Sequence, residues 1–406
     1  MSFLFLAGSK MNAFGRGTVS ATSTAAITAT TAIYDSDPSL PHIFNSAAAD
    51  MYLQVTLNAL TNPGFETSTV ASWTDNDQGT GTSTETLTGA EVRTGTKACE
   101  MTGTDSSNYG SRYQDITVAA GEYRKATVYG IAIAAGAGKL FIRNLRTGNY
   151  YNGSAWASTR AHAATATSTS FTAITVTYQV ESFETCRADT ATLRWELVCD
   201  SGNYSFDDAL DVPGVTFAGI FGHNYGPVVP TVRSSDDGSA WTDRSTMTVK
   251  RPAFFSTFSI IYAEYWRIVL VGTNHEAAYT GEAVLGQYST STTSPMWGLP
   301  KVRNTPGIRS RGPSGRPHVY TYATDPPQDI ELTFSARTAA AAMQLADDLW
   351  LRSGQGLYPV ILVPIDTETD VYFGRFMDPV TVERPFQGIY ETTLSLVGDP
   401  FPTVGA

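Results

Sequence analysis

Short segments in which apolar and polar residues alternate recur along this chain, and they restrict it to a fold built from β-sheets. In MYLQVTL (51–57) every second residue is large and apolar, which is the period of a strand with one buried face. The same period occurs in 191–199, and the β-branched segment 170–180 is similar. Turn signals such as Asn152-Gly153 separate these segments. Many short strands with few helical segments are typical of β-sandwiches.

The chain is long and poor in charge, with 406 residues of which 16% are charged. An average soluble protein has about 25% charged residues, and one core organises roughly 100–200 residues, so two or three domains are expected. Small and hydroxyl-bearing residues replace the charges, as in β-rich extracellular scaffolds. The net charge of −11 argues against DNA or RNA as a partner, because nucleic-acid affinity depends mostly on cations that neutralise phosphates.

No motif for catalysis is found in the sequence. The three cysteines are an odd number and cannot form a closed set of disulfides, so buried free thiols are expected. The usual zinc, redox, acyl-transfer and phosphoryl-transfer motifs are missing. Acidic pairs at 75/77, 207/208, 236/237 and 347/348 fall in predicted turns or on the polar side of a helix, whereas a glycosidase needs two acids across a cleft. We therefore expect no enzymatic activity.

The start of the chain carries no recognisable secretion signal. Its apolar run at 3–7 is too short for the core of a signal peptide, and no stretch reaches the roughly 18–20 apolar residues of a membrane span. We therefore expect assembly in a cytoplasm and no membrane span, although the composition is of an extracellular type. A virion protein, assembled inside the host cell and released by lysis, satisfies both expectations.

Residues 61–212 carry two motifs at their ends, NPGFE (62–66) and YSFDDALDV (204–212). With the alternating strands between them, they resemble the jelly-roll carbohydrate-binding modules of families 4, 9 and 22. The resemblance implies a structural Ca²⁺ held by Glu66, Asp207 and Asp208, since a hard cation takes several oxygen ligands. The alternative is that these acids only cap turns or accept hydrogen bonds from loop amides.

Such modules bind sugars through flat aromatic side chains that stack on the pyranose ring, beside a few hydrogen-bonding groups. The aromatic residues that this block offers in polar, turn-rich sequence are Tyr109, Tyr113, Tyr150, Tyr151 and Trp156. We interpret them as candidate carbohydrate-binding residues. Core or rim positions in the sandwich are the alternative for each of them.

The residues that flank this block resemble a galactose-binding-like (discoidin) sandwich of the sort found in phage tail proteins. The resemblance is carried by GHN (222–224), the hairpin SDDGSAW (235–241) and YWR (265–267). We therefore predict a discontinuous domain, 1–60 with 213–288, into which the module 61–212 is inserted. Insertion at a surface loop is inexpensive because the ends of a domain usually lie close together.

The last part of the chain, 318–406, contains the one persuasive helix. Thr338 can cap 339–351, in which apolar residues share one side, and Ser353-Gly354 ends it. Strands are expected at 330–334, 358–365, 371–376 and 389–397. With DIELTF (329–334) and YFGRF (372–376), the region resembles the tail-tube-like β-sandwich of phage distal and minor tail proteins. The predicted fold class is thus mainly β: several β-sandwiches, the last with one packed α-helix.

Basic residues gather in the segment 289–317, which reads as a linker and an exposed basic loop. They include Arg303, Arg309, Arg311 and Arg316 in an otherwise acidic chain. We expect this loop to dock on an acidic surface of a neighbouring subunit or of the tail tube. A solvated loop is the alternative.

These features together predict a structural component of a bacteriophage tail tip or baseplate. It would form a homo-oligomeric ring, a trimer or hexamer, through its C-terminal domain and contact the tail tube and hub. The inserted sandwich would be displayed for attachment to host-surface glycans. The rival interpretation is a secreted or cell-surface carbohydrate-binding protein without catalytic activity, and an enzyme with a scattered site is the least favoured class.

Overall fold

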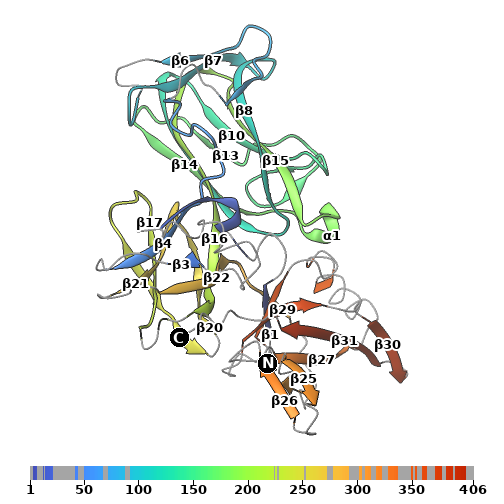
Figure 1. The fold of residues 1–406 in the computed structure, drawn as a ribbon. Coiled ribbons are helices and arrows are strands. Elements are labelled where there is room, and N and C mark those ends of the chain that lie inside the picture. Colours follow the sequence, from blue (N-terminus) through green and yellow to red (C-terminus); the bar gives the residue numbers. More distant parts are fainter. Residues whose placement is uncertain are drawn as a thin grey trace. The chain divides into compact units, whose positions relative to one another are not determined.

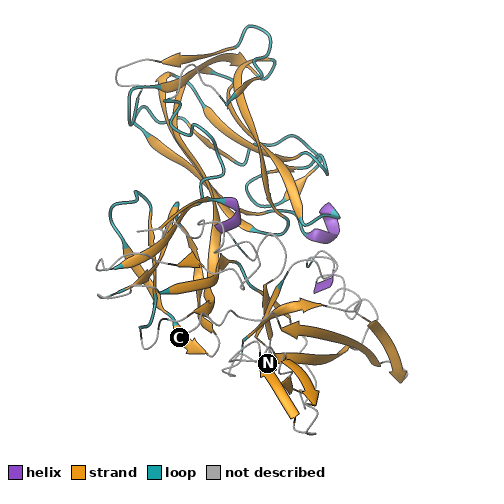
Figure 2. Cartoon of the chain, viewed as in Figure 1, coloured by secondary structure: helices purple, strands orange, loops and turns teal. Residues whose placement is uncertain are grey.

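A computed structural model describes the chain over 3–6, 12, 14–21, 42–43, 50–66, 72–86, 92–223, 225, 228–250, 253–271, 278–291, 301–303, 307–311, 317–321, 328–336, 349–350, 353, 359–363, 371–376, 381–386 and 389–398. Strands dominate these residues (Figures 1 and 2), which confirms the predicted mainly-β fold class. Among the described residues before 224, the helical pieces are a 3-10 turn, Phe14–Arg16, and the short α1, Phe183–Cys186. No helix in the described ranges is long and apolar enough to cross a membrane.

The helix predicted at 339–351 lies largely outside the described residues. Leu349 and Trp350 are described, and both are helical. Leu349 is fully buried, and the amide of Ser353 donates to the carbonyl of Leu349 at 3.2 Å. Ser353, predicted to end this helix, therefore closes a helical turn onto Leu349.

The chain folds into two compact units. Unit 1 comprises 1–56, 215–261 and 265–406, and unit 2 comprises 57–214 with 262–264. The long strand β16 (Gly202–His223) begins in unit 2 and ends in unit 1. Unit 2 is thus one nearly continuous stretch of sequence between two parts of unit 1.

Unit 2 is built from two groups of antiparallel strands (Figure 1). The first group has the order β12-β11-β10-β15-β8, with β5 on β8 and β13 on β10. Its strands are β5 (Thr74–Asp75), β8 (Asn108–Ala119), β10 (Gly138–Asn144), β11 (Tyr150–Tyr151), β12 (Trp156–Ala157), β13 (Ala164–Ala166) and β15 (Thr190–Cys199). The second group pairs β6 (Thr82–Thr86) with β7 (Ala98–Asp105), β7 with β16, β16 with β9 (Tyr123–Ala134), and β9 with β14 (Thr172–Gln179).

One apolar core joins the inward sides of these strands. Leu193, Trp195 and Leu197 of β15 are fully buried in it, as the alternation in 191–199 predicts. Trp195 lies 6.1 Å from Trp73 between ring centroids, and Trp73 lies 5.1 Å from Phe65. The two-residue period of the strand therefore leaves residues 194 and 196 on the opposite side of the sheet.

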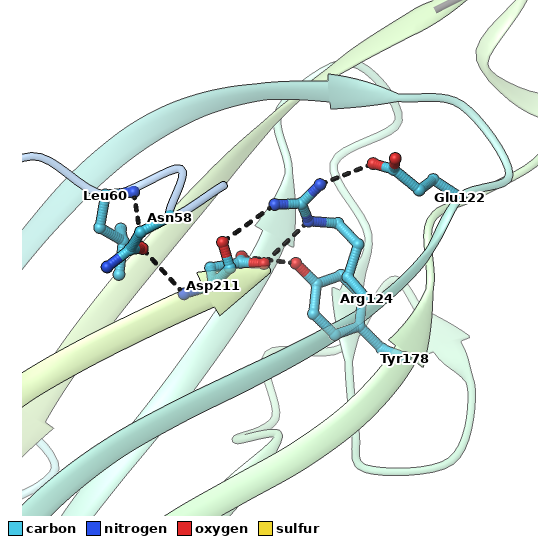
Figure 3. Close-up of polar contacts among 6 residues, drawn as sticks. All are labelled: Asn58, Leu60, Glu122, Arg124, Tyr178 and Asp211. Carbon is cyan, nitrogen blue, oxygen red and sulfur yellow. Dashed lines mark hydrogen bonds and ion pairs between the residues drawn. The ribbon is translucent and has the colours of Figure 1, made fainter. Parts of the chain in front are cut away.

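A charged network is buried in unit 2 (Figure 3). Arg124 donates to Asp211 Oδ1 at 2.8 Å and to Glu122 Oε2 at 2.6 Å, and Tyr178 donates to Asp211 Oδ2 at 2.7 Å. Burial raises the pKa of Asp211, against the opposing effect of Arg124. Burial also raises the pKa of Tyr178, and the adjacent Asp211 raises it further. A buried guanidinium is tolerated here because two carboxylates satisfy it.

Asn58 ties the start of unit 2 to its end (Figure 3). Its Oδ1 accepts from the amides of Leu60 at 3.2 Å and Asp211 at 3.1 Å, and its Nδ2 donates to the carbonyl of Ala209 at 3.2 Å. The amide of Ala59 also donates to the carbonyl of Asp211 at 3.0 Å. The two chain segments that lead into and out of the sandwich are therefore neighbours.

Unit 1 contains a five-stranded sheet of order β18-β17-β21-β4-β2. These strands are β2 (Thr18–Ala21), β4 (Met51–Thr56), β17 (Thr231–Ser235), β18 (Thr242–Thr246) and β21 (Tyr265–Leu270). In β4 every second residue is buried, which confirms the strand predicted from MYLQVTL. The second half of β16 pairs with β22 (Tyr279–Gly286), beside β3 (His42–Ile43), β19 (Thr248–Lys250) and β20 (Ala253–Tyr262).

The C-terminal sheet of unit 1 has the order β23-β1-β28-β29-β31-β27-β24, with β30 on β31. Its strands are β1 (Phe3–Leu6), β23 (Ser289–Ser291), β24 (Lys301–Arg303), β27 (Gln328–Ala336), β28 (Val360–Val363), β29 (Tyr372–Phe376), β30 (Thr381–Phe386) and β31 (Ile389–Gly398). All four strands predicted after residue 318 are present. Phe221 lies 4.9 Å from Phe373, so residues before and after the predicted linker share one apolar cluster.

Candidate functional site

One face of the first strand group of unit 2 combines aromatic and charged side chains. Because Leu193, Trp195 and Leu197 point into the core, Arg194 and Glu196 point to the other face. Register aligns them in rows: Phe141, Glu196 and Tyr113 in one, and Tyr150, Arg143, Arg194 and Asp115 in the next. We name this surface the Arg–Tyr face and define it by Tyr109, Tyr113, Asp115, Phe141, Arg143, Tyr150, Arg160, Arg194 and Glu196.

Arg194 is held by a two-point contact with its cross-strand neighbour Asp115. Its Nε donates to Oδ1 at 2.8 Å and its Nη2 to Oδ2 at 3.0 Å. These hydrogen bonds raise the pKa of Arg194 despite partial burial. The guanidinium carbon also lies 3.7 Å from the ring centroid of Tyr113. Arg194 thereby fixes the position of an aromatic ring on the face.

Glu196 is nearly buried beneath the segment that carries Arg160. Its Oε1 accepts from Ser111 Oγ at 2.8 Å and Asn76 Nδ2 at 2.9 Å, and Arg160 Nη2 lies 3.5 Å from both of its oxygens. Arg160 in turn lies over the rings of Phe141 at 4.5 Å and Tyr109 at 5.1 Å. Arg160 therefore links the carboxylate to two rings of the face.

Arg143 is the cation of this face that lacks a counter-charge. It lies 5.2 Å above the ring of Tyr150, and its cross-strand neighbour on the other side is Arg194. Its Nε is buried without a hydrogen-bond partner, and none of the carboxylates in the described part of the chain is within ion-pair distance of it. Like charges directly opposite each other on a sheet are unfavourable.

The structure divides the five predicted carbohydrate-binding residues between two sides of the sheet. Tyr109, Tyr113 and Tyr150 lie on the Arg–Tyr face, each partly exposed. Tyr151 and Trp156 pack toward the core against Tyr178, with the Tyr151 hydroxyl donating to the carbonyl of Thr177 and Trp156 Nε1 to that of Gln179. Tyr151 and Trp156 therefore lie at core or rim positions, as the alternative interpretation of these residues states.

The three predicted calcium ligands surround the segment 93–97. Glu66 accepts from the amides of Thr96 at 2.9 Å and Lys97 at 3.1 Å, and these bonds outweigh burial and lower its pKa. Asp207 accepts from the amides of residues 93 and 94 at 2.8 and 3.1 Å, while burial raises its pKa to about 6. Asp208 Oδ2 pairs with the Arg93 guanidinium at 2.6 Å.

These acids bind donors of one loop, and Oδ1 of Asp207 and of Asp208 both lie within 4 Å of the Cβ position of Gly64. Gly95 lets the loop approach them: it has a φ of +68°, and a Cβ added there would lie 2.1 Å from Glu66 Oε1. Across the described ranges, no three histidine, cysteine or acidic side chains are grouped to hold a metal ion. The acids accept hydrogen bonds from loop amides, as the alternative interpretation states. The calcium ion stays a prediction from the resemblance.

The basic residues of the predicted loop lie mainly on strands. Arg303 ends β24, and Arg309 and Arg311 belong to β25 (Gly307–Arg311), which pairs with β26 (Pro317–Thr321). Arg316 lies outside the described residues. An antiparallel hairpin thus replaces most of the expected extended loop.

Sequence reasoning missed Phe141, Arg143, Arg160, Arg194 and Glu196. The sequence did contain a signal for four of them. In FIR (141–143) and RWE (194–196) the first and last residues flank an apolar core position, so both face away from the core if the segment is a strand. Polar positions in such strands are usually solvated, so the pattern alone did not single them out. Their grouping depends on the pairing of strands 50 residues apart, which alternation does not reveal.

The sequence matches no family model and no curated protein. Among solved structures, the fold is similar to the enzymatically active domain of tailspike protein 4 of bacteriophage CBA120, with a TM-score of 0.29, 10% identity and 39% of this chain covered. The match spans only 21% of that tailspike domain. It is also similar to TmCBM61 in complex with β-1,4-galactotriose, with a TM-score of 0.28, 16% identity, and 38% of this chain and 98% of that one covered.

A third similar structure is the family 11 carbohydrate-binding module from Clostridium thermocellum in complex with a mixed-linked tetrasaccharide. Its TM-score is 0.24 at 11% identity, and the match covers 41% of this chain and 96% of the module. At these TM-scores the similarity assigns no relative. The described residues define a mainly-β protein of two units, one of which is a sandwich with an aromatic, arginine-rich face.

Proposed function

We propose that the Arg–Tyr face binds carbohydrate. The observation that carries the proposal is the placement of three partly exposed tyrosines, Tyr109, Tyr113 and Tyr150, on one sheet face among fixed polar groups. A sugar ring offers an apolar C–H face to an aromatic ring and hydroxyls to charged or amide side chains. Arg194 and Asp115 hold each other in place before any ligand arrives, so little side-chain ordering accompanies binding.

The test is a glycan array followed by calorimetry with the full chain. Tyr113→Ser removes a ring from the face, whereas Tyr123→Ser removes a ring that is 47% exposed on β9, in the other strand group. We expect the first variant to lose about 10-fold or more in affinity, since one stacking ring contributes on the order of 1–2 kcal/mol. The second should bind like the wild type. Equal binding by wild type and Tyr113→Ser would refute the assignment to this face.

We further propose that the chain is a component of a phage tail tip, with unit 2 as its host-attachment module. Support comes from the C-terminal strands, since β27, β28, β29 and β31 fall where the resemblance to tail-tube-like sandwiches predicts them. On this proposal the protein belongs to the virion, contacts the tail tube and hub, and forms a ring of three or six copies. The basic hairpin β25–β26 would contribute to the ring interface.

Mass spectrometry of purified virions, with immunogold labelling of tail tips, tests the location. Native mass spectrometry tests the ring, and Arg309→Glu with Arg311→Glu should reduce the assembled fraction if the hairpin is at the interface. Lys125→Glu, on β9 of unit 2, is the control. It makes the same charge reversal as each of these two substitutions, at one position outside the hairpin. A monomer that is secreted by its host cell and binds polysaccharide would favour the rival, a cell-surface carbohydrate-binding protein.

A further inference from the structure

The balance of charge on the Arg–Tyr face differs from that of the whole chain. The chain has a net charge of −11, yet β10, β15 and the adjacent loop bring Arg143, Arg160 and Arg194 to one surface. Asp115 neutralises Arg194 through two hydrogen bonds. Glu196 is 3.5 Å from Arg160, but it also accepts from Ser111 and Asn76. The positive charge of the face thus exceeds what its two carboxylates balance.

The excess is concentrated at Arg143. It stands directly opposite Arg194 in the β10–β15 register, and the carboxylate of Asp115 is bound to the far partner of this pair. The neighbour of Arg143 on the other side, Tyr150, offers only its ring. With Nε lacking an acceptor, the guanidinium has neither a counter-ion nor a full set of hydrogen bonds. A guanidinium in that state attracts an external anion, and it fits a carboxylate best because their donors and acceptors match in pairs.

We propose that the saccharide bound by this face carries carboxylates, as in a uronic acid polymer, and that Arg143 binds one of them. This inference rests on the proposed function of the Arg–Tyr face. A carboxylate at Arg143 supplies the counter-charge that this arginine lacks, and a neighbouring sugar ring lies against Tyr150 or Tyr113. Arg143 is then a specificity-determining residue: it selects acidic over neutral chains, while the tyrosines supply affinity common to both.

The experiment compares acidic polysaccharides with their carboxyl-reduced forms, which are neutral but otherwise alike. Polygalacturonate, alginate and hyaluronan fragments of matched length are titrated into the full chain by calorimetry. We expect at least one acidic polymer to bind 10-fold or more tightly than its reduced form, with an affinity that falls as salt is added. Arg143→Gln should abolish this preference by lowering the affinity for the acidic polymer 10-fold or more, to that for its reduced form. Arg143→Lys, which keeps the charge but loses the paired donors, should retain part of it.

Two controls make the outcome specific. Lys125→Gln removes the same charge from β9 in the other strand group, and it should not change the preference. Dextran sulfate tests general attraction of polyanions: if it binds as well as the uronates, or if Lys125→Gln weakens uronate binding as much as Arg143→Gln, the inference is overturned. Equal binding of acidic and reduced polymers would also overturn it but leave carbohydrate binding intact. A chain that binds no saccharide of either kind would refute the proposed function itself.

Discussion

Arg124 donates its Nε–H to Oδ1 of Asp211 at 2.8 Å, and both side chains are at most 2% exposed. The pair lies inside a sandwich whose other buried residues are mostly apolar. Glu122 completes the network, so three charges lose water together. Such a group is stable only when complete, because each partner satisfies another.

Arg124→Met should therefore destabilise unit 2 strongly. The substitution leaves Glu122 and Asp211 buried without their cation, at a cost of about 3–5 kcal/mol. Urea unfolding followed by tryptophan fluorescence measures it. Arg146→Met, an exposed arginine in the turn after β10, is the control and should change stability by less than about 0.5 kcal/mol. A triple variant that also carries Glu122→Gln and Asp211→Asn should recover part of the loss, and failure to recover would argue against electrostatics as the cause.

Unit 1 should lose stability in mild acid because His223 is buried. Its ring stacks 4.2 Å from Phe254 and 5.1 Å from Tyr225, and burial lowers its pKa from 6.5 to about 4. The unfolded chain therefore takes up a proton first. The stability that neutral His223 contributes is complete above pH 6.5 and is lost as the pH falls toward 4.

The measurement is urea unfolding at a series of pH values. His223→Phe and His223→Gln should each flatten the curve between pH 6.5 and 4, where one proton changes the free energy of unfolding by at most about 1.4 kcal/mol per pH unit. Parallel curves for the wild type and both variants would show that another group dominates this range.

The three cysteines should be inert in the native protein. All are free and buried, as the sequence predicts, and burial raises the pKa of Cys99 to about 12. At pH 8 a thiol of that pKa is ionised in only about one molecule in ten thousand, and the thiolate is the reactive form. An Ellman assay should find almost no rapid reaction in native protein and three thiols per chain in denaturant. Rapid labelling of the native chain would contradict the burial.

Glu66→Ala should loosen the segment 93–97. Thr96 and Lys97 lose the acceptor of their amides, at a cost of about 1 kcal/mol for hydrogen bonds at an exposed carboxylate. The segment contains Arg93 and Lys97, so limited trypsin digestion reports its opening directly. Thr185→Ala, on the exposed end of α1, is a control that should not alter this cleavage.

The same digestion tests the calcium ion implied by the resemblance. Slower cleavage of the wild type in calcium than in chelator, lost in Glu66→Ala, would support a bound ion, because a ligand specific to the native state suppresses opening. Equal rates would leave the hydrogen bonds to Glu66 and Asp207 as the anchors of the loop.

The strands were predictable from local sequence, whereas the site depended on what local sequence does not contain. Alternation placed Met51–Thr56 and Thr190–Cys199 on strands because every second residue of each is apolar and buried. The adjacent Tyr150 and Tyr151 show the limit: one residue of register decides which ring faces the core, and both have the same local sequence. Arg143 and Arg194 become neighbours only through strand pairing, so their juxtaposition was not visible before the fold was known.

The hydrogen bond from Ala59 to Asp211, with Asn58 bound to both segments, has a consequence for how such a protein changes over generations. A stretch of about 150 residues that begins and ends at the same point is encoded by one uninterrupted piece of gene. Recombination at two nearby junctions can exchange that cassette for another sandwich while the sheets of unit 1 keep their own sequence. On the proposed function, such an exchange replaces the saccharide preference of unit 2 in a single genetic event, without any point mutation in the rest of the chain.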